Sequence, residues 1–397
     1  MSFKHTCTAL LCSAALLFGT AAAPALAAEK KETAKPIRVD LAKEARSAVL
    51  MDAATGTILF DKNSNEKLPP ASVTKVMTML LIMEAVDNGK VKWNDKIRTS
   101  EYAASMGGSQ IFLEPGEEMT LSEMFKGIAV ASANDGAVAV AEHLAGSEEA
   151  FVEMMNERAK QLGATHTHFS NVNGLPTENH YTTAHDIALM SRELLKHEAV
   201  TKYTSIYEDH LRKSSEKPFW LVNTNKLVKF YSGMDGLKTG YTTEAKYCLS
   251  ATAKRNGFRV IAVVMGEPTS PKRNAEISQM MDYAFANYKS DVFFKAGDTV
   301  DKILIDKGEV RELPMVAGDT VGVLMKKGEK KEGYQREIVF NDVQAPIKKG
   351  QVIGQILVKK EGKVVAKTDL VAPRDVNEAS MWELFKRTVI SWMTFGG

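Results

Sequence analysis

The periodicity of apolar residues changes once along this chain, close to Tyr288, and that change limits the folds open to it. Before Tyr288, segments with helical spacing alternate with short β-branched runs. From about Val292 to Pro373, apolar and polar residues alternate with a period of two, and Lys-Glu-Gly type turns separate the runs. A chain of 397 residues is also too long for one ordinary core. We therefore expect a mixed domain followed by a small all-β domain.

The mixed region has strand patterns at its two ends and helical patterns between them. Residues 47–63 read as a hairpin with a Thr-Gly turn, and residues 245–266 read as a second hairpin that turns at Asn256-Gly257. Strands so far apart must pair within one sheet, which is an α+β arrangement. The expected helices, including one that closes the region, are 73–87, 121–144, 148–162, 183–195 and 273–288.

The start of the chain is expected to be an export signal. Lys4 and His5 precede an apolar run, and Ala25-Leu26-Ala27 has the small-x-small pattern of a signal peptidase site. Residues 1–27 would then be removed and the protein would work outside the cell membrane. Of three cysteines only Cys248 lies beyond this segment, so the mature chain can form no internal disulfide.

The end of the chain, residues 376–397, is expected to be an amphipathic helix. It is too short and too interrupted to span a bilayer. It could pack on the β-domain or lie in the plane of a membrane surface as an anchor. We favour the anchor because a terminal amphipathic helix with two tryptophans suits an interface. The apolar positions recur at spacings of three, four and seven, beside Lys386 and Arg387: Met381, Trp382, Phe385, Val389, Trp392 and Met393.

The balance of charges and the spacing of possible metal ligands argue against two classes of function, nucleic-acid binding and metal-dependent catalysis. The 51 basic and 49 acidic residues nearly cancel, so nothing favours a nucleic-acid partner. No histidine pair of the His-Glu-x-x-His type occurs on one helix, so we expect neither a metal nor a cofactor. Cys248 lies in an apolar strand and is expected to be a small buried hydrophobe. The histidines that cluster in one region, read as a polar loop, are His166, His168, His180 and His185.

Three Ser-x-x-Lys pairs occur, and only Ser72/Lys75 lies where a helix begins. Ser64/Lys67 and Ser214/Lys217 fall in polar, proline-bounded stretches that read as solvated loops. Residues three apart share a helix face, so the Lys75 amine can reach the Ser72 hydroxyl. Such a lysine acts as a base only when it is neutral, and both burial and a second cation lower its pKa.

Two more short motifs complete the candidate site. Lys238-Thr239-Gly240, placed before the strand that starts near Ala245, offers the second cation, and Gly240 would let a ligand approach the backbone closely. Ser132 and Asn134 interrupt an apolar helical region, where buried polar groups need hydrogen-bond partners. Each motif alone could be a turn or a capped helix junction, but together, in this order, the three are far more specific than any one of them.

The order Ser-x-x-Lys, Ser-Ala-Asn, Lys-Thr-Gly resembles the signature of penicillin-binding proteins and class A β-lactamases, whose central motif is Ser-Asp-Asn. Nearly the whole chain resembles the low-molecular-mass penicillin-binding proteins that act as serine D-alanyl-D-alanine carboxypeptidases. "ASMGGSQIFLEPGE", "NGLPTENHYTTAHDIA" and "FWLVNTNKLV" look closest to members from endospore-forming bacteria.

This resemblance implies a fold and a location. The catalytic domain, over 38–289, would have the β-lactamase/transpeptidase-like fold, an antiparallel sheet with helices on both sides. A small all-β domain would follow over 292–374. The helix over 376–397 would hold the protein at the outer face of the cytoplasmic membrane, or the protein would be secreted to the cell wall.

The resemblance also implies roles for residues that match the family motifs. Ser72 would attack the penultimate D-alanine carbonyl of peptidoglycan stem peptides, Lys75 would take its proton, and Ser132 would relay a proton to the leaving D-alanine. The backbone N–H groups of Ser72 and Tyr241 would form the oxyanion hole. A β-lactam would leave a slowly hydrolysed acyl group on Ser72. The implied substrate-binding residues are Asn134, Lys238, Thr239, Gly240, Tyr241 and Arg273.

Three alternatives stay open beside the preferred carboxypeptidase. A D,D-endopeptidase that cleaves peptidoglycan cross-links would use the same residues. A class A β-lactamase would need a glutamate for deacylation, and the corresponding region, 171–186, has no Glu-x-x-Leu-Asn. A non-catalytic wall-binding sensor would have lost the nucleophile, which this chain keeps.

Overall fold

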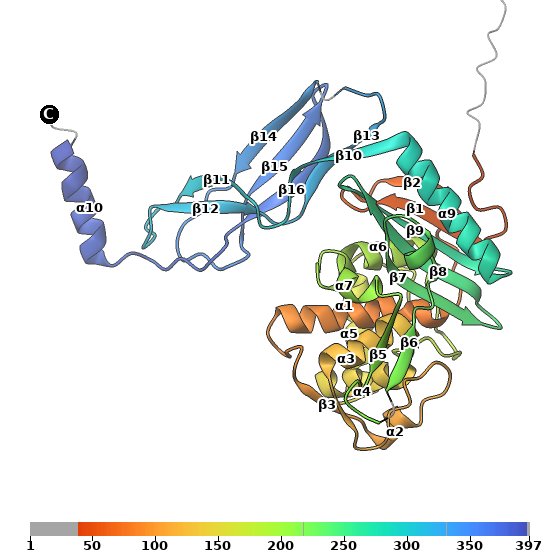
Figure 1. The fold of residues 1–397 in the computed structure, drawn as a ribbon. Helices are drawn as coiled ribbons and strands as arrows, with labels where there is room; N and C mark the ends of the chain where they lie inside the picture. The colour runs from red at the N-terminus through yellow and green to blue at the C-terminus, as the bar shows by residue number, and fades with distance from the viewer. Residues whose placement is uncertain (1–38, 217, 331, 395–397) are drawn as a thin grey trace, which may run out of the picture. The chain divides into compact units, whose positions relative to one another are not determined.

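A computed structural model describes residues 39–394 except Lys217 and Lys331 (Figure 1). The predicted export signal over 1–27 lies outside the described residues. The structure is mixed helix and sheet up to Tyr288, forms β-strands from there to Val371 and ends in a helix, as the sequence predicts.

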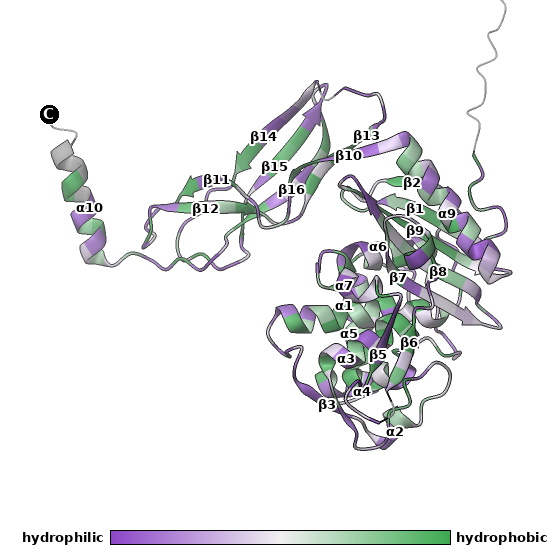
Figure 2. Ribbon diagram, in the orientation of Figure 1, coloured by the Kyte–Doolittle hydropathy of each residue, from purple (hydrophilic) through white to green (hydrophobic). Residues whose placement is uncertain are grey.

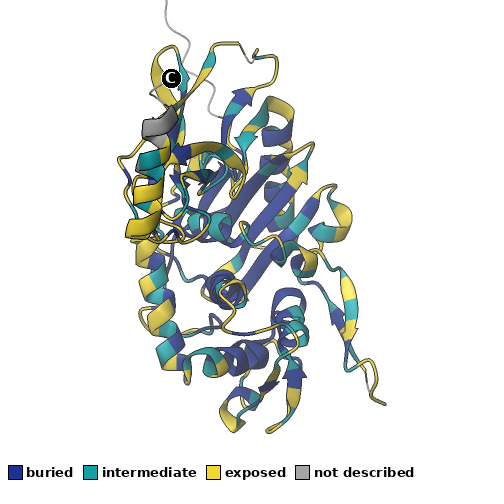
Figure 3. Cartoon of the chain, turned by 90° about the vertical axis from the view of Figure 1, so that its left-hand side faces the viewer, coloured by how far each residue is buried: buried dark blue, intermediate teal, exposed yellow. Residues whose placement is uncertain are grey.

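A five-stranded antiparallel sheet organises the mixed region, in the order β2-β1-β9-β8-β7. Both predicted hairpins are confirmed, β1 with β2 and β8 with β9, and β1 also pairs with β9 from Ser47↔Met265 onward. This long-range pairing joins the two ends of the region, as the α+β prediction requires. Strands β1, β7, β8 and β9 are buried over most of their length, whereas β2 at the edge of the sheet is only partly buried (Figure 3). Their bounds are β1 Ser47–Asp52, β2 Ile58–Lys62, β7 Met234–Thr242, β8 Lys246–Arg255 and β9 Phe258–Glu267.

Helices cover both faces of this sheet (Figure 1). Alternate residues of β1 divide between two cores: Val49 and Met51 pack with α1 (Lys75–Asp87) and α6 (Ala184–Leu194), whereas Ala48 and Leu50 pack with α9 (Ser270–Asn287). Helix α1 is buried on nearly all sides, which explains its apolar residues at almost every position.

The single helix predicted over 121–144 is wrong. Helix α3 (Leu121–Lys126) continues into a wider π-helical turn, η2 (Gly127–Ala131), and Ser132 then adopts a left-handed conformation with φ of 66°. Helix α4 (Asn134–Ala145) begins anew after this break. The remaining elements of this region are α2 Glu101–Ala104, α5 Glu148–Gln161, α7 Val200–Thr204, α8 Leu227–Phe230, the β3/β4 pair (Lys96–Arg98, Glu118–Thr120) and the β5/β6 pair (Glu208–Leu211, Phe219–Val222).

The region after α9 is all-β, as predicted, and has its own core around Leu313, Met315 and Ile353. A two-stranded pair and a five-stranded sheet in the order β11-β12-β16-β15-β14 build it. Its strands are β10 Tyr288–Phe294, β11 Thr299–Leu304, β12 Glu312–Ala317, β13 Val321–Lys326, β14 Tyr334–Phe340, β15 Val352–Lys360 and β16 Lys363–Val371. The pair joins β10 to β13.

The last helix, α10 (Met381–Thr394), has hydrophobic and hydrophilic residues interleaved along its length (Figure 2). Trp382 and Phe385 are 62% and 59% exposed, and their rings stack 5.7 Å apart. The side chains of Trp392 and Met393 lie outside the described part of the structure. Among the described residues we find no helix with both the length and the apolarity that crossing a membrane demands.

Candidate active site

The first motif forms a tight turn at the start of α1. Pro70 precedes a short 3-10 helix, η1 (Ala71–Thr74), and the α-helix begins at Lys75. The turn bends sharply because Ala71 is left-handed, with φ of 48°. As a result Ser72 is half-buried at the edge of the turn, while the Lys75 side chain runs into the core and is fully buried.

The Lys75 amine meets three oxygen atoms. Its Nζ lies 3.2 Å from Ser72 Oγ, 2.6 Å from Asn134 Oδ1 and 2.8 Å from the backbone oxygen of Asn173. Burial, and then the positive charge of Lys238, hold the pKa of Lys75 well below its usual range, while Asp135 acts in the opposite direction. Burial and a second cation are the two causes that the sequence predicts.

The helix break carries the second motif to the same place. Asn134, the first residue of α4, accepts from Lys75 and donates through Nδ2 to the Gly107 oxygen at 2.7 Å. Ser132 is 3% exposed, and its Oγ has no hydrogen-bond partner among the described residues. The expectation that buried polar groups here have partners therefore holds for Asn134 and fails for Ser132.

The third motif comes before strand β8, as expected, and is itself part of a strand, β7, which pairs with β8. Lys238 Nζ donates to the Thr239 oxygen at 2.9 Å, and burial followed by the charge of Arg273 lowers the pKa of Lys238 to about 7. Thr239 Oγ1 donates to Thr224 Oγ1 at 2.7 Å. Gly240 faces the turn Ala71–Thr74, here called the nucleophile turn after the role expected of Ser72, because a Cβ on Gly240 would lie 3.1 Å from the Ser72 nitrogen.

Tyr241 and Arg273 border the Lys-Thr-Gly strand. Tyr241 is 53% exposed, and its ring lies 4.4 Å from that of Tyr247 on β8. Arg273 is 4% exposed in the first turns of α9 and donates to Ser270 Oγ at 3.1 Å, while burial lowers its pKa to about 10. The charge of Arg273 lowers the pKa of Lys238, so the two side chains lie close enough to interact electrostatically.

Two further residues at the turn were missed by sequence reasoning. Asn173 contributes a backbone carbonyl to Lys75, and Gly174, with φ of 84°, packs so tightly on the turn that a Cβ would lie 1.9 Å from the Ala71 oxygen. The Asn-Gly dipeptide signals a turn, but no sequence signal says what that turn contacts. Only the fold brings the two residues to Ser72.

Asp135 was also missed, although it neighbours Asn134. Its buried carboxylate accepts the backbone N–H groups of Ile111 and Leu113, each at 3.1 Å to Oδ2. It thereby fixes the segment that begins at Gly107 and contacts the Asn134 amide. Asp135 is therefore part of the support of the second motif.

The other sequence candidates lie outside this constellation. Ser64, expected in a solvated loop, is 1% exposed and donates to the Asp61 carboxylate, so that expectation is wrong. Ser214 is exposed, and its partner Lys217 lies outside the described residues. Cys248 is fully buried and burial raises its pKa to about 11. Across the described chain, no group of three or more histidine, cysteine or acidic side chains could hold a metal ion.

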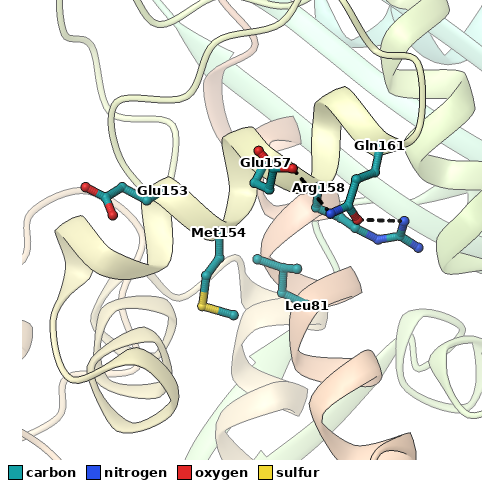
Figure 4. Close-up of a pocket in the computed structure, with 6 residues that line it drawn as sticks. All are labelled: Leu81, Glu153, Met154, Glu157, Arg158 and Gln161. Atoms are coloured by element: carbon teal, nitrogen blue, oxygen red, sulfur yellow. Dashed lines mark hydrogen bonds between the residues drawn. The ribbon is translucent and has the colours of Figure 1, made fainter.

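A surface pocket on α5 is distinct from this site (Figure 4). Gln161 links two of its charged side chains: Arg158 donates to the Gln161 amide oxygen, and the Gln161 amide nitrogen donates to Glu157. None of the predicted site residues lines it. The complete lining is Leu81, Glu153, Met154, Glu157, Arg158 and Gln161.

The sequence of the chain matches two protein-family models. Residues 30–269 match the D-alanyl-D-alanine carboxypeptidase family, peptidase S11, and residues 288–378 match the C-terminal domain of penicillin-binding protein 5. The chain is 53% identical over 357 residues to D-alanyl-D-alanine carboxypeptidase DacF of Bacillus subtilis, covering 90% of this chain and 92% of the relative.

More distant relatives show the same likeness. D-alanyl-D-alanine carboxypeptidase DacC of Escherichia coli is 32% identical, over 88% of this chain and 89% of its own length. The crystal structure of penicillin-binding protein 5 from Haemophilus influenzae matches with a TM-score of 0.66 and 31% identity, over 84% of this chain and 98% of that one. With matches of this extent over both its domains, the chain belongs to the D-alanyl-D-alanine carboxypeptidase family, peptidase S11.

Proposed function

We propose that this protein is a serine-type D-alanyl-D-alanine carboxypeptidase. It removes the terminal D-alanine from peptidoglycan stem pentapeptides through an acyl-enzyme on Ser72, and β-lactams inhibit it. One observation carries the proposal. A fully buried lysine with a strongly lowered pKa lies 3.2 Å from the hydroxyl of a half-buried serine.

The hydrogen-bond partners of Lys75 are those that a neutral amine acting as a base requires. A neutral amine has two N–H donors and one lone pair, whereas an ammonium group has three donors and no lone pair. The oxygens of Asn134 and Asn173 take two donors at 2.6 and 2.8 Å. The lone pair of the neutral amine is then left for the Ser72 hydroxyl, which donates its proton to Lys75.

Acylation follows from this arrangement. Ser72 Oγ attacks the carbonyl of the penultimate D-alanine as Lys75 takes the hydroxyl proton, and the N–H groups of Ser72 and Tyr241 stabilise the oxyanion. The amide C–N bond breaks, and the proton passes from Lys75 through Ser132 to the departing amine. The Ser132 hydroxyl has no partner among the described residues, so it is available for this relay. Water then hydrolyses the acyl-enzyme.

Substrate binding uses the remaining motif residues. Lys238, Thr239 and Arg273 recognise the terminal carboxylate, and the Asn134 amide holds the peptide. A β-lactam carries an acyl group and a carboxylate at similar positions, so it acylates Ser72 and stays attached. Neither a metal nor a cofactor takes part in the proposed reaction.

Release of D-alanine from a Lys-D-Ala-D-Ala peptide tests the proposal. The wild type should release D-alanine and Ser72→Ala should not, while Ser214→Ala, an exposed serine of another Ser-x-x-Lys pair, serves as the matched control. Mass spectrometry after labelling with a fluorescent penicillin should place the adduct on Ser72. An adduct on another serine, or no release by the wild type, would refute the proposal. Cleavage of cross-linked peptides in place of pentapeptides would identify an endopeptidase.

We also propose where the protein works. Residues 1–27 direct export and are removed, and α10 lies in the outer surface of the cytoplasmic membrane. Support comes from its exposed apolar side chains, among them Met381 at 83% and Ile390 at 60%, and from Lys386, whose Nζ lies 5.3 Å from the Trp382 ring centre. The catalytic and β-domain bounds, 38–289 and 292–374, remain predictions.

Sedimentation with vesicles tests the anchor. Residues 28–397 should sediment with vesicles of anionic lipid, and the double variant Trp382→Ser/Phe385→Ser should sediment about tenfold less. Leu304→Ser removes an apolar side chain that is 74% exposed on β11, so it controls for loss of any exposed hydrophobe. Equal sedimentation of the double variant and the wild type would exclude α10 as the anchor.

A further inference from the structure

The nucleophile turn contains a conformation that needs support from outside the turn. Ala71 directly precedes Ser72 and has φ of 48°, in the left-handed region that residues with a Cβ disfavour. Left to itself, the backbone would relax out of this region and carry Ser72 with it. The contacts that hold the Ala71 peptide in place therefore set the position of the Ser72 hydroxyl and N–H.

A buried hydrogen-bond chain ends on the Ala71 carbonyl. Thr74, 2% exposed, donates from Oγ1 to the Ala71 oxygen at 2.8 Å. Nε2 of His180 lies 2.8 Å from the same Thr74 Oγ1, and the backbone N–H of Ser170 donates to His180 Nδ1 at 3.0 Å. His180 is 8% exposed and packs edge-on against the ring of Phe169.

The donors and acceptors of these groups allow only one direction of donation along the hydrogen-bond chain. Because the Ser170 N–H needs a lone pair on Nδ1, the hydrogen of the neutral imidazole is on Nε2. His180 therefore donates to Thr74 Oγ1, and the Thr74 hydroxyl is left to donate its own hydrogen to the Ala71 carbonyl. Burial, and then His168, lower the pKa of His180 to about 4, so the imidazole is neutral at pH 7.

We propose that His180 is a positioning residue for Ser72, acting through Thr74 and the Ala71 carbonyl to hold the nucleophile turn in its left-handed conformation. The inference rests on the proposed role of Ser72 as nucleophile. It assigns a function to one of the four clustered histidines, which the proposed mechanism does not otherwise use.

The segment that carries His180 is well placed for this role. Thr182 exchanges two backbone hydrogen bonds, of 2.8 and 3.0 Å, with Leu68, just before the turn. Asn173 and Gly174, on the same segment, contact Lys75 and the Ala71 oxygen. Residues 168–182 thus contact the nucleophile turn at several points. The His180 side chain is the one that hydrogen-bonds to Thr74 within the turn.

Two pairs of variants test the hydrogen-bond chain from His180 through Thr74 to Ala71. His180→Ala removes it, while His180→Gln keeps a side chain that can both donate and accept. Thr74→Val removes the hydroxyl at nearly constant volume, and Thr74→Ser keeps it. His210→Ala, an exposed histidine on β5, is the control. The measurements are the second-order rate constant of acylation by a fluorescent penicillin, kcat and KM for the peptide, and Tm.

Acylation should slow by about tenfold or more in His180→Ala and Thr74→Val, because a small displacement of a nucleophile has large effects on rate. His180→Gln and Thr74→Ser should stay within about threefold of the wild type. The double variant His180→Ala/Thr74→Val should be no slower than the slower single variant, since both break one chain. A purely structural role would lower Tm in every variant and leave the acylation rate of the folded protein unchanged.

Acylation by His180→Ala within about twofold of the wild type would overturn the inference, as would a Thr74→Ser variant as slow as Thr74→Val. If His180→Ala fails to fold, the Thr74 pair decides alone. A crystal structure of Thr74→Val should show Ala71 outside the left-handed region, and an unchanged φ would contradict the inference. This last readout needs no activity, so it separates failure of the inference from failure of the proposed reaction.

Discussion

Gly240 offers a direct test of how closely the Lys-Thr-Gly strand and the nucleophile turn are fitted. In Gly240→Ala, the new Cβ would lie 2.8 Å from the Pro70 oxygen and 3.1 Å from the Ser72 nitrogen. Relative to the 3.4 Å at which ordinary contact begins, strand and turn must separate by about 0.3 to 0.6 Å. Either movement displaces a donor of the proposed oxyanion hole, because Tyr241 follows Gly240 on the strand and Ser72 lies in the turn.

We expect Gly240→Ala to slow acylation about 10- to 100-fold, since displacements below 1 Å and weakened oxyanion donors have effects of this size. The assay is the rate of labelling by a fluorescent penicillin, normalised to folded protein from circular dichroism. Thr243→Ala, at an exposed position in the hairpin after the same strand, should label at the wild-type rate. Labelling of Gly240→Ala within about twofold of the wild type would show that the strand and the turn are not fitted this tightly.

The remaining predictions concern pH. The kcat/KM should rise as Lys75 loses its proton and fall above about pH 7 as Lys238 loses its charge, and Lys238→Arg should move the alkaline limb to higher pH. His180 has a pKa of about 4 when folded against 6.5 unfolded, so wild-type Tm should drop between pH 6.5 and 4 more than that of His180→Gln. Burial, and then Glu276, raise the pKa of Glu267, so the folded state binds the Glu267 proton more tightly than the unfolded state and loses this stabilisation as pH rises. Glu267→Gln, which cannot ionise, should therefore have a higher Tm than the wild type at pH 8.

Local signals made some elements predictable. Strands β8 and β9 follow from the Asn256-Gly257 turn, where both residues have positive φ, between two apolar runs. Strand β7 has no such signal: its residues, "MDGLKTGYT", include two glycines and do not alternate. It is a strand because it pairs with β8 and packs against the nucleophile turn, and both are contacts with distant parts of the chain.

The site residues divide in the same way, into those that local sequence reveals and those that only contacts with distant parts of the chain place there. Ser72, Lys75, Asn134 and Lys238 could be found because their side chains carry the chemistry and form a known signature. Asn173 could not, because it contributes a backbone carbonyl that every residue type possesses. Ser132 and Asn134 could be recognised as an interruption of an apolar helical region. The end of the helix at that point could not be predicted, because the surroundings are apolar enough for one continuous helix and only the left-handed Ser132 breaks it.

Each cation of the site lowers the pKa of the next one, from Arg273 to Lys238 to Lys75. Arg273 keeps a pKa of about 10 and stays charged at pH 7, and its charge helps to lower the pKa of Lys238 to about 7. Lys238 in turn helps to hold the pKa of Lys75 well below its usual range. On the proposed mechanism, the substrate carboxylate binds beside Lys238 and Arg273 and offsets their positive charge. The pKa of Lys75 should therefore rise when substrate binds, so the amine becomes a stronger base at the step in which it must accept the Ser72 proton.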